Sequence, residues 1–258
     1  MHYACIIPCF NEGERIKELI SELESIDSSY IDWFLVDNGS FDSSFDFIFK
    51  NNQKKFYKNI NFIRKSTNEG YGNGIKYGLN QIKNFKKSKK NTNIIFNSYS
   101  NYFALGWTHA DGQTPVFDLI SATRQADQIS TNEYLVKGIR NTREDGLIST
   151  IFTSFLNLII FTIFSKNCIN PNSQPTLVSK DLLFRILDDA SNDGSFDLSI
   201  LLKSTKYKIS YSRFPIKFLK RKRGLGSNES IYQKVKYSID LLIFLWGNRR
   251  FSKFYNIF

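Results

Sequence analysis

Short apolar runs alternate with amphipathic segments through the first half of the chain. The first run, 3–7, closes at Pro8, and apolar side chains then recur at helical spacing, at Ile16, Leu19, Ile20 and Leu23. Two more apolar runs, 33–36 and 60–63, are each followed by polar, glycine-containing segments. This pattern predicts three strands, with a helix after the first.

The same alternation continues further along the chain. After the third run, apolar residues recur at helical spacing, at Ile75, Leu79 and Ile82, which predicts a second helix. The lysine-rich stretch 83–90 that follows is typical of a solvated helix end and loop. A fourth apolar run, 102–107, and a strand-like segment, 132–140, come next. Strands that alternate with helices predict βαβ units, and therefore an α/β fold with a mainly parallel sheet flanked by helices.

Polar, glycine- or proline-containing turns lie between the predicted strands and the segments that follow them. Parallel strands present their carboxyl ends at one edge of a sheet, and ligands bind beyond that edge. We therefore expect the loops around four residues to meet there, namely Pro8, Asp37, Gly70 and Asp111.

The charge of the chain narrows the choice of partners. The 258 residues suffice for one large α/β domain or two small ones, and they carry a formal net charge of +11. This charge favours an anionic partner, such as a nucleotide or an acidic membrane surface. No nucleic-acid recognition module is evident, so nucleic acid is not expected as a partner. The absence of a signal-peptide pattern and of metal-type cysteine spacing predicts a reducing cytoplasm; the cysteines are Cys5, Cys9 and Cys168.

Four motifs follow one another in the chain: IPCFNEGERI, VDNGSFDSS, NEGYGNGIKYGL and GWTHADGQTP. Together they resemble the nucleotide-sugar half of family 2 glycosyltransferases, the inverting GT-A type. Within that family the likeness is to polyprenyl-phosphate hexose transferases, such as dolichyl-phosphate mannose synthase, over residues 3–228. The resemblance implies a Rossmann-like GT-A domain at 1–228, with a nucleotide-sugar half at 1–130 and an acceptor half at 131–228. A C-terminal amphipathic helix or tail is expected at 229–258.

The resemblance also implies which residues bind a UDP- or GDP-linked sugar. Asp37 would accept hydrogen bonds from the base or ribose, and a buried acceptor discriminates strongly because a ligand without the donor leaves it unpaired. As local structure alone, Asp37 would belong to an ordinary turn and Asn11 would cap a helix. The implied nucleotide-sugar-binding residues are Pro8, Asn11, Glu12, Asp37, Asp42, Gly70, Gly72 and Asp111.

The metal motif of the family is Asp-x-Asp, often followed by Gln, and this chain departs from it. His109 stands in place of the first acid, whereas Asp111 and Gln113 match. These three residues are the implied metal ligands, and the nitrogen ligand favours Mn²⁺ slightly over Mg²⁺. Two alternatives stay open. Either His109 is a hydrogen-bonded strand-end residue and Asp111 alone contacts the metal, or the protein binds nucleotide sugars without catalysis.

Arginines in the second half match positions where the family binds its acceptor. The planar fork of arginine binds phosphate bidentately. The implied catalytic residues are Asp111, Arg140 and Arg221. The alternative is that 203–223, which is rich in lysine and arginine and lacks acids, is a solvated basic run. The implied acceptor-phosphate-binding residues are Arg140, Arg143, Arg221, Arg223 and Ser227.

The acceptor decides whether a catalytic base is needed. A lipid monophosphate is already an anion, whereas a sugar hydroxyl requires a carboxylate nearby. The candidate carboxylates for a hydroxyl acceptor are Asp188, Asp189, Asp193 and Asp197, of which the resemblance favours Asp197. The expected reaction is transfer of a hexose, with inversion, to a polyprenyl phosphate. Transfer to a saccharide hydroxyl in cell-envelope polysaccharide assembly is the alternative.

Two segments bear on membrane contact. Residues 147–165 lack charge and place a broad apolar stripe opposite serines and threonines, which is typical of an amphipathic helix. Core packing is the first interpretation of this helix, and attachment at a membrane interface is the second. The run 239–246 is too short to span a bilayer. Basic and aromatic residues beyond it fit anionic headgroups, so a peripheral location on the cytoplasmic face of a membrane is expected; they are Arg249, Arg250, Phe251, Lys253, Phe254, Tyr255 and Phe258.

Overall fold

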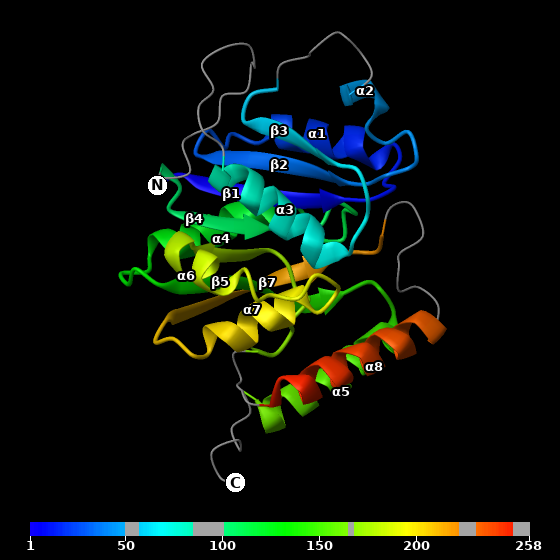
Figure 1. The fold of residues 1–258 in the computed structure, drawn as a ribbon, viewed down its shortest axis with the longest axis vertical. Helices are drawn as coiled ribbons and strands as arrows, with labels where there is room; N and C mark the ends of the chain where they lie inside the picture. The colour runs from blue at the N-terminus through cyan, green and yellow to red at the C-terminus, as the bar shows by residue number, and fades with distance from the viewer. Residues whose placement is uncertain (50–56, 85–100, 165–167, 222–230, 250–258) are drawn as a thin grey trace.

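The computed structural model describes residues 1–49, 57–84, 101–164, 168–221 and 231–249. Its centre is a seven-stranded sheet in the order β3-β2-β1-β4-β6-β5-β7 (Figure 1). The strands are β1 (Tyr3–Cys9), β2 (Ile31–Asn38), β3 (Ile60–Lys65), β4 (Ala104–Trp107), β5 (Tyr134–Arg143), β6 (Thr176–Ser179) and β7 (Ser210–Phe218).

Among the described strands, only β6 opposes the common direction. β1 pairs in parallel with β2 on one side and with β4 on the other. β6 is antiparallel to both β4 and β5, and β7 then pairs in parallel with β5 at the edge of the sheet. The prediction of a mainly parallel sheet flanked by helices is therefore confirmed.

Helices cover both faces of the sheet (Figure 1). Alternate residues of β1 point to opposite faces, so Cys5 joins the core with α1 and α4, while Ile6 joins the core with α3, α6 and α7. The helices are α1 (Arg15–Ser25), α2 (Asp46–Phe49), α3 (Tyr71–Asn84), α4 (Phe117–Asp127), α5 (Leu147–Ile163), α6 (Lys180–Ile186), α7 (Phe196–Ser204) and α8 (Ile231–Gly247).

The N-terminus of α3 packs closely against the segment that leads into α7. A Cβ added at Gly72 would lie 2.5 Å from the carbonyl oxygen of Ser191 and 2.7 Å from Cβ of Phe196. The backbone of Gly72 also donates a hydrogen bond to the Asp193 carbonyl oxygen at 3.3 Å. This approach joins the two predicted halves of the chain beside the carboxyl ends of β1 and β4.

The two helices α5 and α8 lie side by side at the end of the molecule opposite β3 (Figure 1). Only Leu156 and Ile160 of α5 are buried, so the interpretation of 147–165 as a core helix is wrong for most of its apolar side chains. The helix covers the rim of the molecule and packs on one side only. None of the described helices is long and apolar enough to cross a membrane. The exposed large apolar side chains of the pair are Leu147, Ile148, Ile151, Phe155, Leu158, Phe161, Ile163, Tyr232, Val235, Ile239, Leu242, Ile243 and Trp246.

The segment 203–223 is more than a solvated basic run, because it contains β7. Phe214 and Ile216 are buried while the neighbouring residues Pro215 and Lys217 are exposed, so the strand has one core-facing side. Because lysine and arginine dominate the composition of this segment, the alternation of buried and exposed positions is hard to recognise in the sequence. Their predicted exposure is confirmed for Lys206, Lys208, Lys217 and Lys220. Of the basic and aromatic tail, Arg249 is exposed, and residues 250–258 lie outside the described residues.

Candidate active site

A cavity of about 1160 Å³ opens at the carboxyl ends of β1, β4 and β5. Loops from both predicted halves of the chain line it, and the inner faces of α5 and α8 form a further wall through residues such as Thr153 and Leu241. The sequence-predicted residues that line this cavity are Pro8, Asn11, Glu12, Gly70, His109, Asp111, Gln113, Arg140, Asp197 and Arg221.

Asp37 does not line the cavity but lies buried behind its wall. Its Oδ1 accepts a hydrogen bond from the backbone N–H of Ser40 at 2.9 Å, and its Oδ2 lies 3.6 Å from Nε of Arg64. The carboxylate therefore stabilises the turn after β2. Its neighbour Asn38 is the residue of this strand that reaches the cavity.

Asp42 and Asn11 tie two loops of the donor side together. The Oδ2 of Asp42 accepts a hydrogen bond from the backbone N–H of Gly13 at 3.1 Å. In the other direction, Oδ1 of Asn11 accepts from the backbone N–H of Phe41 at 3.0 Å. These exchanged bonds fix the loop after β1, which carries Glu12, against the loop after β2.

The turn after β4 presents the predicted metal ligands. Gly112 has a φ of 77°, a conformation that glycine adopts readily, and the chain reverses there. The backbone N–H of Gln113 donates to Oδ1 of Asp111 at 2.9 Å, and the Gln113 side chain donates to the carbonyl oxygen of Leu219 at 3.2 Å. These contacts join the turn to the end of β7.

His109 lies at the start of this turn, with its ring centroid 5.7 Å from that of Tyr71. Its imidazole makes no hydrogen bond to any of the described residues. Burial lowers the pKa of His109 below its usual value, although Asp111 opposes the shift. The imidazole is therefore neutral near pH 7, which is the form that binds a metal.

Arg221 bridges the two carboxylates closest to this turn. Its Nη1 lies 3.4 Å from Oδ2 of Asp111, and its Nη2 lies 3.4 Å from Oε2 of Glu12. Burial raises the pKa of Glu12 to about 7, while Arg221 acts in the opposite direction and Asp111 adds to the rise. The guanidinium thus offsets the repulsion between two partly buried acids.

The described residues fit a divalent cation that is shared with a substrate. Among them, no group of three or more His, Cys, Asp or Glu side chains could hold a metal ion. His109 offers a neutral nitrogen, and Asp111 offers the carboxylate oxygen Oδ2, which lies 3.4 Å from Nη1 of Arg221. The remaining ligands would be phosphate oxygens and water, as is usual for a cation bound with a diphosphate.

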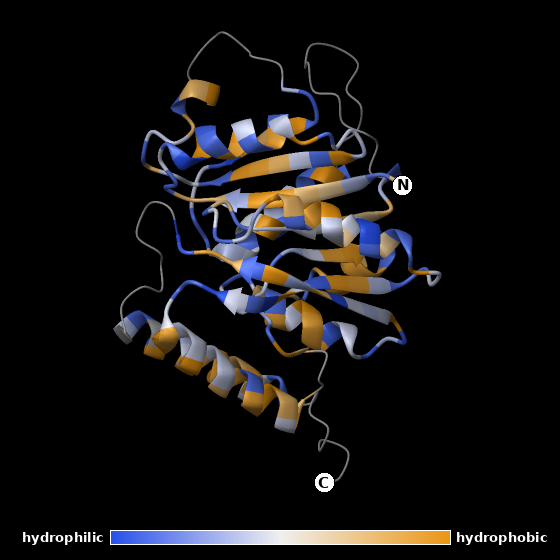
Figure 2. Ribbon diagram, turned by 180° about the vertical axis from the view of Figure 1, so that it is seen from behind, coloured by the Kyte–Doolittle hydropathy of each residue, from blue (hydrophilic) through white to orange (hydrophobic). Residues whose placement is uncertain are grey.

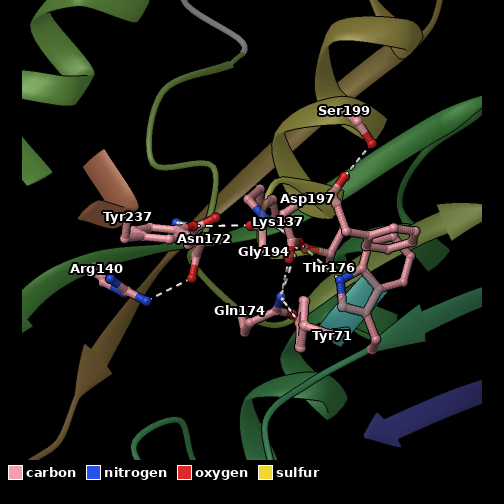
Figure 3. Close-up of polar contacts among 12 residues, drawn as sticks. Tyr71, Lys137, Arg140, Asn172, Gln174, Thr176, Gly194, Asp197, Ser199 and Tyr237 are labelled. Atoms are coloured by element: carbon pink, nitrogen blue, oxygen red, sulfur yellow. Dashed lines mark hydrogen bonds and ion pairs between the residues drawn. The ribbon is translucent and has the colours of Figure 1, made fainter. Parts of the chain in front are cut away.

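A buried polar cluster surrounds Asp197, which lines the acceptor side of the cavity (Figure 3). Asp197 accepts hydrogen bonds from Nε1 of Trp107 and from Nε2 of Gln174, both at 2.9 Å, and Nζ of Lys137 lies 3.4 Å away. Gln174 also donates to the hydroxyl of Tyr71 at 3.0 Å. The side chains of Asp197 and Lys137 are each only 2% exposed.

This cluster leaves Asp197 poorly suited to remove a proton from an acceptor. Its Oδ1 accepts hydrogen bonds from Trp107 and Thr176, its Oδ2 accepts one from Gln174, and protonation of the carboxylate would remove the counter-charge of Lys137. Burial lowers the pKa of Lys137 to about 8, although Asp197 opposes the shift. The other candidate carboxylates do not line the cavity; they are Asp188, Asp189 and Asp193.

Arg140 reaches the cavity from the end of β5. Its Nη2 donates to the carbonyl oxygen of Asn172 at 2.7 Å, and its guanidinium lies 3.8 Å from the centroid of the Phe218 ring. Its buried Nε has no hydrogen-bond partner among the described residues. Burial lowers the pKa of Arg140 to about 10, with Arg143 the next cause. A desolvated guanidinium with an unused donor is well suited to bind an anion.

The other predicted acceptor residues are placed differently. Arg143 forms a bidentate ion pair with Asp145, with N–O distances of 2.9 and 2.6 Å. Its Nε and Nη2 groups therefore already donate to a carboxylate of the protein. Arg223 and Ser227 lie outside the described residues. Of the predicted set, Arg140 and Arg221 are therefore the described arginines that face the cavity.

Several cavity residues carry no signal in the sequence. Tyr71 stands next to a predicted glycine, but nothing in the motif marks the tyrosine itself. Gln174 does not line the cavity itself, but its amide occupies the space beside Asp197. Tyr237 comes from α8, which carries no motif of the family, and Asn172 reaches the site only through long-range packing.

Comparison with known sequences bears on the N-terminal segment. The sequence model described as Glycosyl transferase family 2 matches residues 4–84. This segment contains β1 to α3 and three of the four motifs, and it supplies the donor-side wall of the cavity. A search of curated proteins gave no match.

Solved structures share the fold over nearly the whole chain. Glucosyl-3-phosphoglycerate synthase from Mycobacterium tuberculosis, in complex with Mn²⁺, uridine diphosphate and glucosyl-3-phosphoglycerate, superposes with a TM-score of 0.60 at 13% identity, covering 94% of this chain and 79% of that chain. Residues 1–349 of S. aureus TarS superpose with a TM-score of 0.50 at 18% identity, covering 94% and 66%. The chain therefore has the GT-A fold that its motifs implied, with a family 2 match in its N-terminal part.

Proposed function

We propose that the protein is a metal-dependent glycosyltransferase that moves a hexose, with inversion, from a nucleoside-diphosphate sugar to a polyprenyl phosphate at a membrane surface. The observation that carries the proposal is the extent of one cavity. It runs from the loops within the family 2 match to the inner faces of α5 and α8. A donor on the first wall and an acceptor against the second would meet between Asp111 and Arg140.

The donor side is supported by the family match and by the ligands of the similar structures. The Mycobacterium tuberculosis synthase binds uridine diphosphate in complexes with Mn²⁺ and with Mg²⁺. In this chain, Asn11 and Glu12 line the corresponding side of the cavity. His109 and Asp111 would hold the cation, which supplies Lewis-acid stabilisation to the departing diphosphate. Arg221 would then exchange its carboxylate contacts for the phosphates of the donor.

The acceptor side rests on Arg140. Its unpartnered Nε and its planar fork suit a phosphate monoester. Such a phosphate is an anion near neutral pH, so one of its oxygens forms the bond to the anomeric carbon as the bond to the diphosphate breaks. No proton has to be removed, and this agrees with the role of Asp197 as the buried counter-charge of Lys137.

A lipid acceptor is favoured by the outer surface of the α5–α8 pair. Large apolar side chains are exposed along both helices, with Leu158 60% and Trp246 73% exposed. Figure 2 shows that hydrophobic residues recur along the whole length of this helix pair. An exposed apolar helix face is a mark of interaction surfaces, and amphipathic helices use such a face to bind in the interfacial region of a membrane. The cavity lies on the inner side of the same helices, so a lipid phosphate could enter it from the membrane surface. A peripheral position on the cytoplasmic face belongs to this proposal.

A small phosphate ester is the second candidate acceptor. The Mycobacterium tuberculosis synthase binds phosphoglyceric acid, and Arg140 would suit the phosphate of such an acceptor equally well. The exposed apolar faces of α5 and α8 would have no part in that reaction, and for this reason the lipid is preferred.

The test is a transfer assay with UDP- and GDP-linked hexoses and three acceptors: a polyprenyl phosphate in anionic vesicles, 3-phosphoglycerate and an oligosaccharide. We expect release of nucleoside diphosphate to require Mn²⁺ or Mg²⁺, to stop with chelator and to rise with the lipid phosphate. Transfer to the oligosaccharide alone would refute the phosphate acceptor. Nucleotide binding without turnover on any acceptor would refute the enzymatic proposal.

A further inference from the structure

The loop Asn170–Gln174, called here the 170–174 loop, lies between the two surface helices and the buried site. Asn157 of α5 holds its first residue through a reciprocal pair of hydrogen bonds. Nδ2 of Asn157 donates to Oδ1 of Asn170 at 3.1 Å, and the backbone N–H of Asn170 donates to Oδ1 of Asn157 at 2.7 Å. At its other end, Gln174 donates to Asp197. The loop is therefore anchored to α5 and to the buried cluster.

The second surface helix holds the middle of this loop through Tyr237 (Figure 3). The hydroxyl of Tyr237 accepts a hydrogen bond from Nδ2 of Asn172 and donates one to the carbonyl oxygen of Gly194 at 3.0 Å. A Cβ added at Gly194 would lie 2.8 Å from Cε2 of the Tyr237 ring. The glycine leaves the space in which the ring lies, so α8 reaches the wall of the cavity at this point.

The same Asn172 holds Arg140. Its carbonyl oxygen accepts the Nη2 hydrogen bond of Arg140, while its side chain binds Tyr237. One residue thus connects α8 to the guanidinium that lines the cavity. The guanidinium also lies over the ring of Phe218, and an aromatic ring attracts a cation without fixing the direction in which its N–H groups point, so the hydrogen bond to Asn172 sets that direction.

We propose that Tyr237 is a positioning residue: by docking α8 onto Asn172 it holds Arg140 in the orientation that binds the phosphate of the acceptor. The inference rests on the proposed function for the identity of that phosphate. By linkage, phosphate bound at Arg140 strengthens the docking of α8 by the same factor by which docked α8 strengthens phosphate binding. Contact of the apolar outer face of α8 with a lipid surface would then act on Arg140 through two hydrogen bonds.

The first test compares Tyr237→Phe with Tyr232→Phe. Both remove one hydroxyl from α8, but Tyr232 is 76% exposed and lies outside the cavity. With a short-chain polyprenyl phosphate, we expect Tyr237→Phe to raise the acceptor KM about fivefold, the ratio that one net hydrogen bond supports. The donor KM, and kcat at saturating acceptor, should change less than about twofold by the same reasoning. Equal acceptor KM values for the two variants would overturn the proposal.

The second test does not depend on transfer. Amide hydrogen exchange of the 170–174 loop and of α8 is followed with and without inorganic phosphate. In the wild-type protein and in Tyr232→Phe, phosphate should slow exchange in both segments. In Tyr237→Phe, and in Gly194→Ala, which displaces the ring, exchange should be faster and the effect of phosphate lost. Unchanged exchange in both of these variants would overturn the proposal.

The two tests also separate this inference from the proposed function. If the wild-type protein transfers no sugar to any polyprenyl phosphate, the lipid acceptor is wrong. Exchange measured with inorganic phosphate still decides whether Tyr237 positions Arg140, because it needs neither donor nor lipid.

Discussion

Replacing Asp197 with Asn removes a buried charge with little change in size. In the wild-type protein this carboxylate is the counter-charge of Lys137 and accepts hydrogen bonds from Trp107 and Gln174. The Asn carbonyl oxygen can keep one of these bonds, but Lys137 is left without a counter-ion. Removal of one partner of a buried ion pair costs about 3–5 kcal/mol, because an uncompensated charge stays in the interior.

The pH dependence of this cost follows from Lys137. Its pKa is lowered to about 8 by burial, against a usual value of 10.5, and Asp197 opposes the shift. In the wild-type protein, the unfolded chain therefore binds more protons than the folded one between about pH 8 and 10.5, and stability rises with pH over that window. In Asp197→Asn the folded pKa falls below 8, so the rise starts at lower pH. The deficit in stability should narrow between pH 6 and 8, by at most about 1.4 kcal/mol per pH unit.

Urea unfolding at pH 6, 7 and 8 measures the deficit, with Asp188→Asn as the control at an exposed position. With a slope of about 3 kcal/mol/M, the midpoint of Asp197→Asn should fall by roughly 1–2 M at pH 6. The control should stay within about 0.5 kcal/mol of the wild type. Unchanged stability with a loss of kcat of about 100-fold or more would refute the reasoning and would make Asp197 a general base.

Three further predictions follow from other contacts. Gly72→Ala should cost about 1–3 kcal/mol in urea unfolding, because its Cβ would lie 2.5 Å from a backbone oxygen, whereas Gly247→Ala, with nothing within 4 Å, should change stability by less than about 1 kcal/mol; equal effects would contradict the packing argument. Arg140→Lys should raise the acceptor KM at least about tenfold, since lysine lacks the planar fork that donates to Asn172 and lies over the ring of Phe218; an unchanged KM would place the phosphate elsewhere. His109→Asp should raise the ratio of Mg²⁺- to Mn²⁺-supported activity, because a carboxylate is a harder ligand than imidazole; an unchanged ratio in metal-replacement assays would remove His109 from the ligand set.

Local patterns were enough to predict the strands β1 to β5 and the helices α1 and α3. In each of these elements, the spacing of the apolar residues follows from the faces that the element buries. In β1, for example, Cys5 and Ile6 point into the cores on opposite faces of the sheet. The motif residues at the strand ends, such as Glu12 and Asp111, could be expected to meet because parallel strands share an edge.

Interactions between distant residues could not be predicted in this way. Gln174 binds Tyr71 across a sequence separation of 103 residues, and nothing in either local pattern requires the contact. Hydrophobicity alone predicts that the apolar side chains of α5 belong to a core, because it does not distinguish a buried helix face from one that is exposed at the rim of the molecule. The role of Asp197 likewise depends on its buried partner Lys137, which the sequence shows only as one polar position in a strand.

The antiparallel strand β6 has a consequence for synthesis of the protein. Thr176–Ser179 lies between β4 and β5 in the sheet, yet it follows both of them in the chain. A nascent chain that ends before Thr176 has one edge of the apolar strand β4 bare, and β5 has no neighbour on either side. Unpaired apolar edges recruit other strands. Until the residues of β6 have emerged from the ribosome, the growing chain therefore exposes strand edges that favour aggregation, and a chaperone that covers them would protect it.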